Sequence, residues 1–525
     1  MDRQCRTFVP RRRIVSKATL SLASIFAIGG CAQPPPTPTP PGFGSNNGAV
    51  ADLSPHAKAA ICGNRSLLTG PSVPPKGSVV VPAGDNSALI PAVHTTYWFA
   101  AGSHTFGGSA YGQIVARSGD VFTGGPGAVL DGRLKNQYAF TGDAANVTIE
   151  YLTIRRFGAA GTNNGQGVVN HNSGPKWLVQ YNTVIDDAGA GVFLGPNSIT
   201  RYNCLSHNGE YGFSSYALHG DRNVVLDHNE IAGNNTYDWE KHVHGCGCSG
   251  GGKFWNTNGG TVANNWVHDN RGPALWADTN DNDFDFENND IENNTAEGII
   301  VEISYNALIR NNRFVRNALV AGPKNPGFPT GAIYLSESGG DARVRARYNT
   351  ISVTGNAFVD NWSGVVLFEN ADRFCGSPSN GSQGFCTLVN PKVVNLKTCV
   401  RGRIRREPYY SDCRWKTQNV TVANNTFTFD PAHIAGCDPS DSCGLQGLFS
   451  NYGTYPPWSP YKGGVIEQAI TFHQGNAFAN NTYAGPWEFM AHDQSRVLTF
   501  RQWRRPPYRQ DRGSKRTGPY LSEGV

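Results

Sequence analysis

Three side chains that could do acid–base chemistry stand at comparable places in consecutive short segments of the chain. They are Lys253 in GGKFWN, Asp278 in PALWAD and Glu302 in GIIVEIS. Two carboxylates about 5 Å apart can act as the acid and the nucleophile or base that break a glycosidic bond. A lysine beside them can instead serve as the base of a β-elimination, if its pKa is lowered. The three residues are therefore predicted to form a site that acts on a sugar chain.

Four neighbouring residues are candidates for substrate contact. Trp255 and Trp276 would offer apolar, hydrogen-bonding faces to a sugar ring. His268 and Arg271 lie in a turn region close to the three candidate catalytic residues. The sequence indicates no cofactor or metal with certainty. The carboxylates could bind Ca²⁺, which would neutralise a uronate.

The elements that must position these residues are repeated short strands. Each repeat ends in an Asn pair, at 264–265, 288–289 and 311–312, so the second members are 24 and 23 residues apart. A period of this length, built of short strands, is typical of a solenoid. Phe284 and Phe286 alternate with acidic residues, which is the two-residue period of a strand with one buried face.

This pattern resembles the right-handed parallel β-helix proteins of the pectate-lyase-like superfamily. The resemblance implies an all-β fold, a single right-handed parallel β-helix with an N-terminal cap and disulfide-containing loop insertions. It also implies coils stacked at the ordinary strand spacing of about 4.8 Å. Asparagines at one turn would stack as a hydrogen-bonded ladder, for which we predict Asn182, Asn203, Asn229, Asn265, Asn289 and Asn312.

Strand parity places the candidate site on the outside of this solenoid. Phe254, Leu275 and Val301 would point inward, so Lys253, Asp278 and Glu302 would point outward. The three residues lie 12, 11 and 10 positions before the ladder residues Asn265, Asn289 and Asn312, so we expect one outward column. Some β-helix polysaccharide lyases carry a Lys base at a position like Lys253. They carry an Arg acid one coil later, where this chain has Asp278, and Arg271 could substitute only if its turn folds back.

Composition along the chain indicates one domain behind a targeting segment. Residues 1–30 have a basic start and a short apolar run, as in a signal peptide, and Ile28-Gly29-Gly30-Cys31 resembles a bacterial lipobox. Cys31 would then be the lipidated first residue of an exported protein, held to a membrane through the Pro-rich tether 31–44. The expected order after the tether is an N-terminal cap and first coils at 45–145, the β-helix at 146–490 with an insertion at 373–414, and a basic C-terminal tail at 491–525.

Charge and cysteine content narrow the partners and the compartment. The first 30 residues hold six of the 45 basic and one of the 40 acidic residues, which leaves 39 of each. This balance argues against nucleic-acid binding, and we expect a monomer. Outside the signal and lipobox cysteines, ten remain, as in an oxidising compartment. We predict the local pairs Cys375/Cys386, Cys399/Cys413 and Cys437/Cys443, and the pairing of Cys246 and Cys248 with Cys204 or with each other, with zinc as the alternative.

Two classes of function follow from these residues. The first is an exported polysaccharide-acting enzyme, either a lyase or a glycoside hydrolase. The second is a non-catalytic β-helix that binds a glycan or serves as a surface scaffold. A β-helix hosts both classes, so the fold alone does not choose between them.

Overall fold

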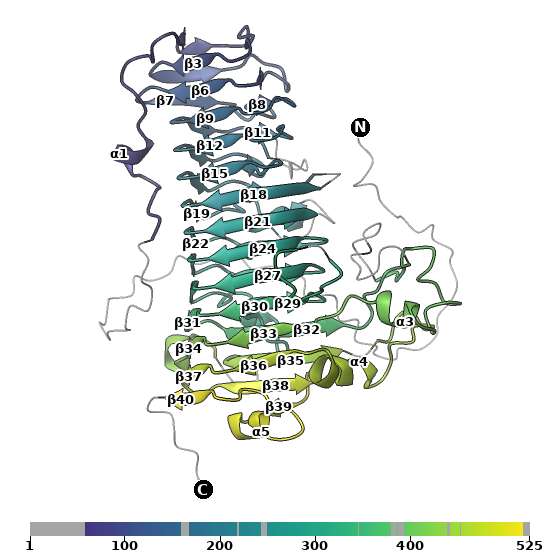
Figure 1. The fold of residues 1–525 in the computed structure, drawn as a ribbon. Helices are drawn as coiled ribbons and strands as arrows, with labels where there is room; N and C mark the ends of the chain where they lie inside the picture. Colours follow the sequence, from purple (N-terminus) through teal and green to yellow (C-terminus); the bar gives the residue numbers. More distant parts are fainter. Residues whose placement is uncertain are drawn as a thin grey trace, which may run out of the picture.

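In the computed structural model the chain forms a tall stack of coils (Figure 1). The structure describes residues 58–158, 167–217, 220–242, 249–344, 346–379, 386, 393–437, 442–451 and 453–517. Strands one coil apart pair in parallel and build three long sheets, which we call sheets 1, 2 and 3. The architecture is a right-handed parallel β-helix, as expected from the sequence.

The strands of sheet 1 are β1 (Val79–Val81), β3 (Thr96–Phe99), β6 (Val121–Gly124), β9 (Thr148–Glu150), β12 (Leu178–Gln180), β15 (Ile199–Arg201), β18 (Asp221–Asp227), β21 (Thr257–Ala263), β24 (Asn282–Glu287), β27 (Tyr305–Arg310), β30 (Ile351–Thr354), β33 (Val420–Ala423) and β36 (Ala477–Ala479). Those of sheet 2 are β2 (Gly84–Asp85), β4 (Gly102–Thr105), β7 (Ala128–Asp131), β10 (Thr153–Arg155), β13 (Thr183–Ile185), β16 (Cys204–Ser206), β19 (Glu230–Ala232), β22 (Trp266–His268), β25 (Asp290–Glu292), β28 (Arg313–Val315), β31 (Ala357–Val359), β34 (Thr426–Thr428), β37 (Thr482–Ala484) and β40 (Lys515–Thr517). Those of sheet 3 are β14 (Val192–Phe193), β17 (Tyr211–Ser214), β20 (Gly250–Trp255), β23 (Leu275–Asp278), β26 (Ile299–Glu302), β29 (Gly331–Ser336), β32 (Ser363–Asn370), β35 (Leu445–Asn451), β38 (Glu488–His492) and β39 (Val497–Leu498).

The remaining elements are short. A small sheet near the first coils contains β5 (Ile114–Val115), β8 (Phe140–Thr141) and β11 (Asn170–His171). The helices are α1 (Arg65–Leu68), α2 (Trp239–His242), η1 (Gly322–Lys324), α3 (Tyr409–Asp412), η2 (Pro431–His433), α4 (Val465–Gln468), the π-helical η4 (Ala469–His473) and α5 (Phe500–Arg504). Among the described helices, none has the length and apolar character needed to cross a membrane.

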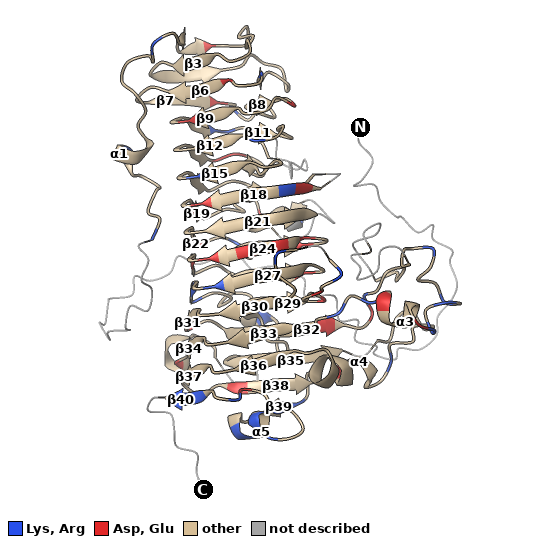
Figure 2. Ribbon diagram, in the orientation of Figure 1, with Lys and Arg blue, Asp and Glu red and all other residues tan. Residues whose placement is uncertain are grey.

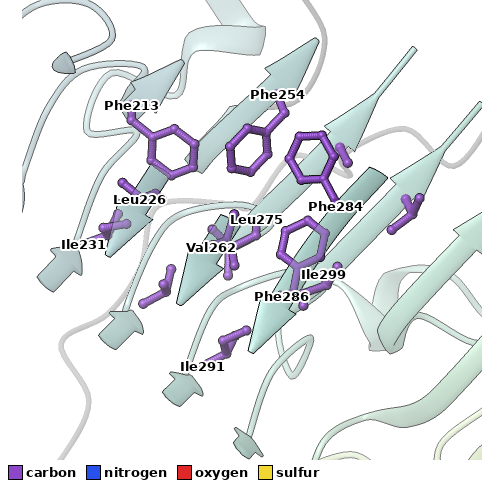
Figure 3. Close-up of a cluster of buried hydrophobic side chains, with 14 of the residues drawn as sticks. Phe213, Leu226, Ile231, Phe254, Val262, Leu275, Phe284, Phe286, Ile291 and Ile299 are labelled. Carbon is purple, nitrogen blue, oxygen red and sulfur yellow. The ribbon is translucent and has the colours of Figure 1, made fainter. Parts of the chain in front are cut away.

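Alternate side chains of most strands fill the space between the sheets. The rings of Phe213, Phe254 and Phe284 contact one another in succession, the first pair tilted and the second edge-on, with centroids 5.0 and 4.9 Å apart (Figure 3). Leu275 and Val301 are also buried in this core, so the predicted parity of these strands is confirmed. Their outward neighbours are therefore available for function.

The predicted Asn ladder is confirmed. The side-chain amide of Asn265 donates to Oδ1 of Asn289 at 3.0 Å, and that of Asn289 donates to Asn312 at 2.9 Å. The residue before each ladder Asn takes the left-handed conformation, as Asn264 does with φ 57°. The ladder contains the six predicted residues and continues through Asn356, Asn425 and Asn481.

A second ladder, which the sequence did not suggest, follows the strands of sheet 2. It contains Asn208, Asn234, Asn270, Asn294, Asn317 and Asn361. Asp187 occupies its first place: Oδ1 of Asp187 accepts from the N–H of Phe157 at 2.7 Å. Its Oδ2 is buried without a hydrogen-bond partner among the described residues, and burial raises the pKa of Asp187 well above its ordinary value.

The N-terminal described segment is fixed across the outside of sheet 2. Cys62 forms a disulfide with Cys204, and the N–H groups of Ile61 and Cys62 each donate to Glu230 at 2.7 Å. The predicted pairing of Cys204 with Cys246 or Cys248 is therefore wrong, because this segment brings Cys62 onto β16. Cys246 and Cys248, with the zinc alternative, lie outside the described residues, as do residues 1–57 with the signal peptide, Cys31 and the tether.

The other three predicted disulfides, Cys375–Cys386, Cys399–Cys413 and Cys437–Cys443, are confirmed. The first two lie in the insertion that follows β32. This insertion, with α3, and the turn with α4 pack together at one edge of the stack (Figure 1) through Phe374 and Tyr461, whose ring centroids are 5.4 Å apart.

The structure differs from the expected C-terminal tail. Residues 491–517 form β39, α5 and β40, and β40 extends sheet 2 by pairing with β37. Trp503 packs on Phe489 at 5.3 Å, and its Nε1 donates to Asp511 at 2.7 Å. An open solenoid end would expose its core and a sheet edge, so this segment acts as a cap. Arg501, Arg504 and Lys515 of this cap are exposed, and Figure 2 marks the basic residues of α5 and β40 in blue.

The second ladder predicts a pH-dependent gain in stability from Asp187→Asn. The folded state holds a proton on Asp187, so its contribution to stability is complete below the unfolded pKa of about 3.9 and is lost as the pH rises. An amide supplies the missing donor at every pH, as Asn234 does to the carbonyl of Leu205. We expect a gain of about 1–3 kcal/mol at pH 7 and little gain at pH 4, measured by thermal unfolding. An equal shift at both pH values would contradict a protonated Asp187.

Candidate functional site

Sheet 3 is the face on which the long connections of the solenoid converge. Sheets 1 and 2 are joined by turns of two residues, such as the one between β21 and β22, or of three, between β6 and β7. The connections before the strands of sheet 3 include 233–249 and 316–330, and those after them include 337–350 and 371–419. Ligand-contacting residues of repeat proteins concentrate where insertions of this kind gather. The predicted site lies between them.

The register of sheet 3 corrects the predicted column. Trp255, Asp278 and Glu302 are consecutive pairing partners on β20, β23 and β26. Lys253 pairs with Trp276 instead, so it stands one outward position earlier, in the neighbouring column. The three residues of the predicted column lie 12, 11 and 10 positions before their ladder residues, so the distances differ by up to two residues. Two residues is the spacing between successive side chains on one face of a strand. Counting residues from the ladder therefore predicted the outward face of Lys253 correctly and its column incorrectly.

Lys253, Asp278 and Trp276 are nevertheless in contact. Nζ of Lys253 lies 2.8 Å from Oδ2 of Asp278 and 3.7 Å from the centroid of the Trp276 ring. Both charged side chains are 14% exposed, so the pair is only partly screened by solvent. Trp276 is largely buried under this ammonium group. It therefore holds the lysine by a cation–π contact and has little surface left for a sugar ring.

Glu302 belongs to a second charged group that the sequence did not reveal. Nη1 of Arg373 donates to Oε1 of Glu302 and, at 2.9 Å, to Oε2 of Glu337. Oε1 of Glu337 accepts from the N–H of Asn370 at 2.5 Å, and Oε2 accepts from the Ser336 hydroxyl at 2.9 Å. The sequence offered one indication of Arg373, because it is the first residue of the predicted insertion. Glu337 follows β29 and has no motif around it that would have identified it.

Burial raises the pKa of several groups around this site. It raises the pKa of Glu337 to about 7, while Arg373 lowers that pKa and Glu302 raises it. Burial also raises the pKa of Glu297 to about 7, and Glu302 adds to the shift. The pKa of the Tyr334 phenol is well above its ordinary value, chiefly through burial, and its hydroxyl donates to Ser336 at 3.1 Å. The site thus contains carboxyl groups that exchange protons near neutral pH.

Trp255 is the half-buried aromatic side chain beside Asp278, and its ring lies 4.7 Å from that of Tyr216. The three glycines before Lys253 have a packing role: a Cβ on Gly252 would lie 2.1 Å from the Phe213 ring, and one on Gly250 would lie 2.1 Å from a backbone oxygen of Pro273. They permit close stacking of coils rather than close approach of a ligand.

His268 and Arg271 are not brought to this site. His268 lies on sheet 2, where its ring stacks on Trp266 at 3.8 Å. Burial lowers the pKa of His268, but hydrogen bonds and charges from Asp269 and Glu230 raise it to about 9. Arg271 is exposed in the following turn, and its Nη1 donates to the carbonyl of Thr236 at 3.4 Å.

Three acidic side chains that follow Asp278 in the sequence are paired with arginines. Asp285 and Glu287 lie 2.8 and 2.6 Å from Arg310, and Asp283 pairs with Arg347 at 3.1 Å. Cationic partners of this kind leave little negative charge for Ca²⁺. Potential metal ligands also lie together near the C-terminal end of the stack, where ligand atoms of Glu467, His492 and Asp493 are within 4.8 Å of one another.

Comparison with known proteins agrees with this architecture. A family model described as "Right handed beta helix region" matches residues 167–371. No curated protein matches the chain. Similar solved structures include the A-module of the Azotobacter vinelandii mannuronan C-5 epimerase AlgE6, with 13% identity, 74% of this chain and 91% of that chain covered, and a TM-score of 0.37. A mutant of the periplasmic alginate epimerase AlgG has 11% identity, 64% and 72% coverage and a TM-score of 0.34. The catalytic domain of a GH87 α-1,3-glucanase in complex with nigerose has 11% identity, 80% and 64% coverage and a TM-score of 0.41.

Arg373→Ala tests the shared guanidinium. It would leave Glu302 and Glu337 facing each other without a cation, which typically costs about 3–5 kcal/mol. The pKa of Glu337 is raised in the folded state, so its contribution is complete below the unfolded pKa of about 4.3 and is lost as the pH rises. Removing Arg373 raises this pKa further. The destabilisation should therefore be small at pH 4 and full at pH 8, as measured by thermal unfolding.

Arg373→Lys is the matched control, because it keeps the charge and should lose less stability at pH 8. A loss of equal size at pH 4 and pH 8 would mean that Arg373 acts by packing alone.

Proposed function

We propose that the protein is an exported enzyme that cleaves a glycosidic bond of a polysaccharide on the outward face of sheet 3. The observation that carries the proposal is the juxtaposition of Asp278 and Glu302 on neighbouring strands, with Lys253 paired to Asp278. In-register neighbours in a sheet are about 4.8 Å apart. Carboxyl groups about 5 Å apart suit a retaining mechanism, in which one is the proton donor and the other the nucleophile.

Hydrolysis is favoured over elimination by the state of the available bases. The Lys253 side chain is engaged by a carboxylate and an aromatic ring, the Asp278 carboxyl group and the Trp276 indole. The pKa of the Tyr334 phenol is raised, so it keeps its proton at neutral pH. A lysine or a tyrosine can abstract a carbon-bound proton only as a neutral amine or a phenolate. Lys253 is better suited to hold Asp278 in place and to stabilise charge near it.

Trp255 and Tyr216 are the aromatic side chains best placed to contact a sugar, since both are half-buried, Trp255 pairs with Asp278 on the next strand, and Tyr216 lies against Trp255. The alternative of a non-catalytic glycan-binding β-helix is favoured by one observation: the Lys253, Asp278, Glu302 and Arg373 charges compensate one another. The same aromatic pair would serve that function.

Site variants should separate these possibilities. The purified protein is assayed on a panel of polysaccharides for new reducing ends and for ultraviolet absorbance, which reports the double bond left by elimination. Asp278→Asn and Glu302→Gln should each lower kcat by about a hundredfold or more, or ~2–4 kcal/mol, with a bell-shaped pH profile in the wild type. Absorbance that depends on Lys253 would instead establish elimination.

Asp285→Asn is the matched control, because it removes a carboxylate from a similar ion pair on sheet 1 and should leave activity unchanged. A folded protein that binds a glycan but produces neither signal is a binding protein. Unaltered turnover in the triple variant of Lys253, Asp278 and Glu302 would remove the site.

We further propose export with lipidation at Cys31. Support comes from the lipobox-like sequence before Cys31 and from the disulfides on the described chain, which form in oxidising compartments. Cys31→Ser should move the protein from the membrane fraction to the soluble fraction after cell fractionation. Unchanged membrane association would exclude the lipid anchor.

A further inference from the structure

We propose that the sugar-binding face of sheet 3 is closed on one side of Glu302, so that the enzyme acts at chain ends, and that Phe328 is the residue that closes it. This inference rests on the proposed function and adds its mode of action. The long connections stand at both ends of the strands of sheet 3. A polysaccharide on this face therefore runs along the stack, from strand to strand.

The outward columns change character along this path. The column of Trp255, Asp278 and Glu302 continues through Ser336 to Phe368 and then Phe449. The neighbouring column of Lys253 and Trp276 continues through Ile300 and Tyr334 to Val366. Each strand from β20 to β29 thus carries at least one charged or polar outward group, alongside Trp276 and Ile300. The outward groups on β32 and β35 are the apolar Val366, Phe368 and Phe449.

The apolar part of these columns is closed to solvent although its side chains point outward. Val366 and Phe449 are 0% exposed and Phe368 is 6% exposed. They form a cluster separate from the solenoid core, together with Leu445, Met490, Phe328 and Tyr334. A sugar chain cannot lie on residues that have no accessible surface.

Phe328 covers this cluster from the connection between β28 and β29. Its ring lies 5.1 Å from that of Phe368, 5.5 Å from Phe449 and 6.0 Å from Tyr334. The connection is held in place by Gly322, where a Cβ would lie 2.1 Å from the buried Trp362 ring. Phe328 is therefore held in place over the apolar outward side chains of sheet 3.

The opposite edge is closed by the insertion after β32. Arg373 bridges Glu302 and Glu337 with only 8% of its side chain exposed, so the start of the insertion lies against the floor beside β29. Between Glu302 on β26 and the covered strand β32 there is one strand, β29. Ser336, the outward residue of β29 in this column, is only 1% exposed, so the floor is closed within about one strand spacing, or ~5 Å, of Glu302. That length accommodates the end of a sugar chain but no continuing polymer.

The test follows products from the wild-type protein on the polysaccharide that it cleaves. Chain-end action should release mono- or disaccharides from the first turnovers, with little loss of viscosity for each reducing end formed. Oligosaccharides labelled at one end should lose units from a single end. Early products of intermediate length with a rapid loss of viscosity would overturn the inference and leave the proposed function standing. Absence of cleavage on every polysaccharide would overturn both.

Phe328→Ala tests the closing residue. It uncovers the Phe368 and Phe449 rings, so we expect early products to become longer and the share of internal cuts to rise severalfold. Phe328→Leu keeps an apolar cover and should retain the wild-type product pattern. A folded Phe328→Ala protein with unchanged products would exclude this role for Phe328, and the labelled-oligosaccharide result for the wild type stands independently of whether the variant folds.

Discussion

The buried amide hydrogen bonds of the Asn ladders are the constraint on which the rest of the molecule depends. Each ladder Asn fixes the position of the next coil, because an unpaired amide inside the stack would cost ~1–3 kcal/mol. The bond survives large changes in coil length: Asn312 donates to Asn356 across 44 residues and Asn356 to Asn425 across 69, each at 3.0 Å. Extra residues are therefore excluded from the turn between sheets 1 and 2. They accumulate at the two ends of sheet 3, and that is why the candidate site lies there.

Repetition explains what could be predicted from the sequence. The Asn pairs and the alternation of strands such as β24 gave the coil, the ladder and the outward direction of Lys253, Asp278 and Glu302. The column of Lys253 could not be assigned by counting, since a slip of two residues preserves the face and changes the column. Short-range disulfides such as Cys399–Cys413 were inferred from proximity in sequence, whereas Cys62–Cys204 joins residues 142 positions apart. Arg373 was missed for the same reason, because it meets Glu302 across 71 residues.

The charges at the candidate site are part of the architecture as well as of the chemistry. Arg373 ties the disulfide-containing insertion to two strands of the solenoid through Glu302 and Glu337. Partly buried charges are costly unless they are paired, so each group holds its neighbour in a defined position. Lys253 has the same relation to Asp278 and Trp276. The reacting groups of an acid–base pair must be held near the geometry of the transition state, and ion pairs of this kind can hold them there.

The transition from polar to apolar side chains on sheet 3 has a simple physical basis. An outward column of Val366, Phe368 and Phe449 would be a hydrophobic patch if it stood in water, at about 25 cal/mol for each Å² exposed. Covering it with Phe328 removes that cost and uses the same insertions that flank the site. Asp278, Glu302 and Ser336 carry polar groups that burial would leave unsolvated, so each of them is paired with a charged or polar neighbour. The boundary between the two regimes falls at β29, and it limits the surface on which a substrate can be bound.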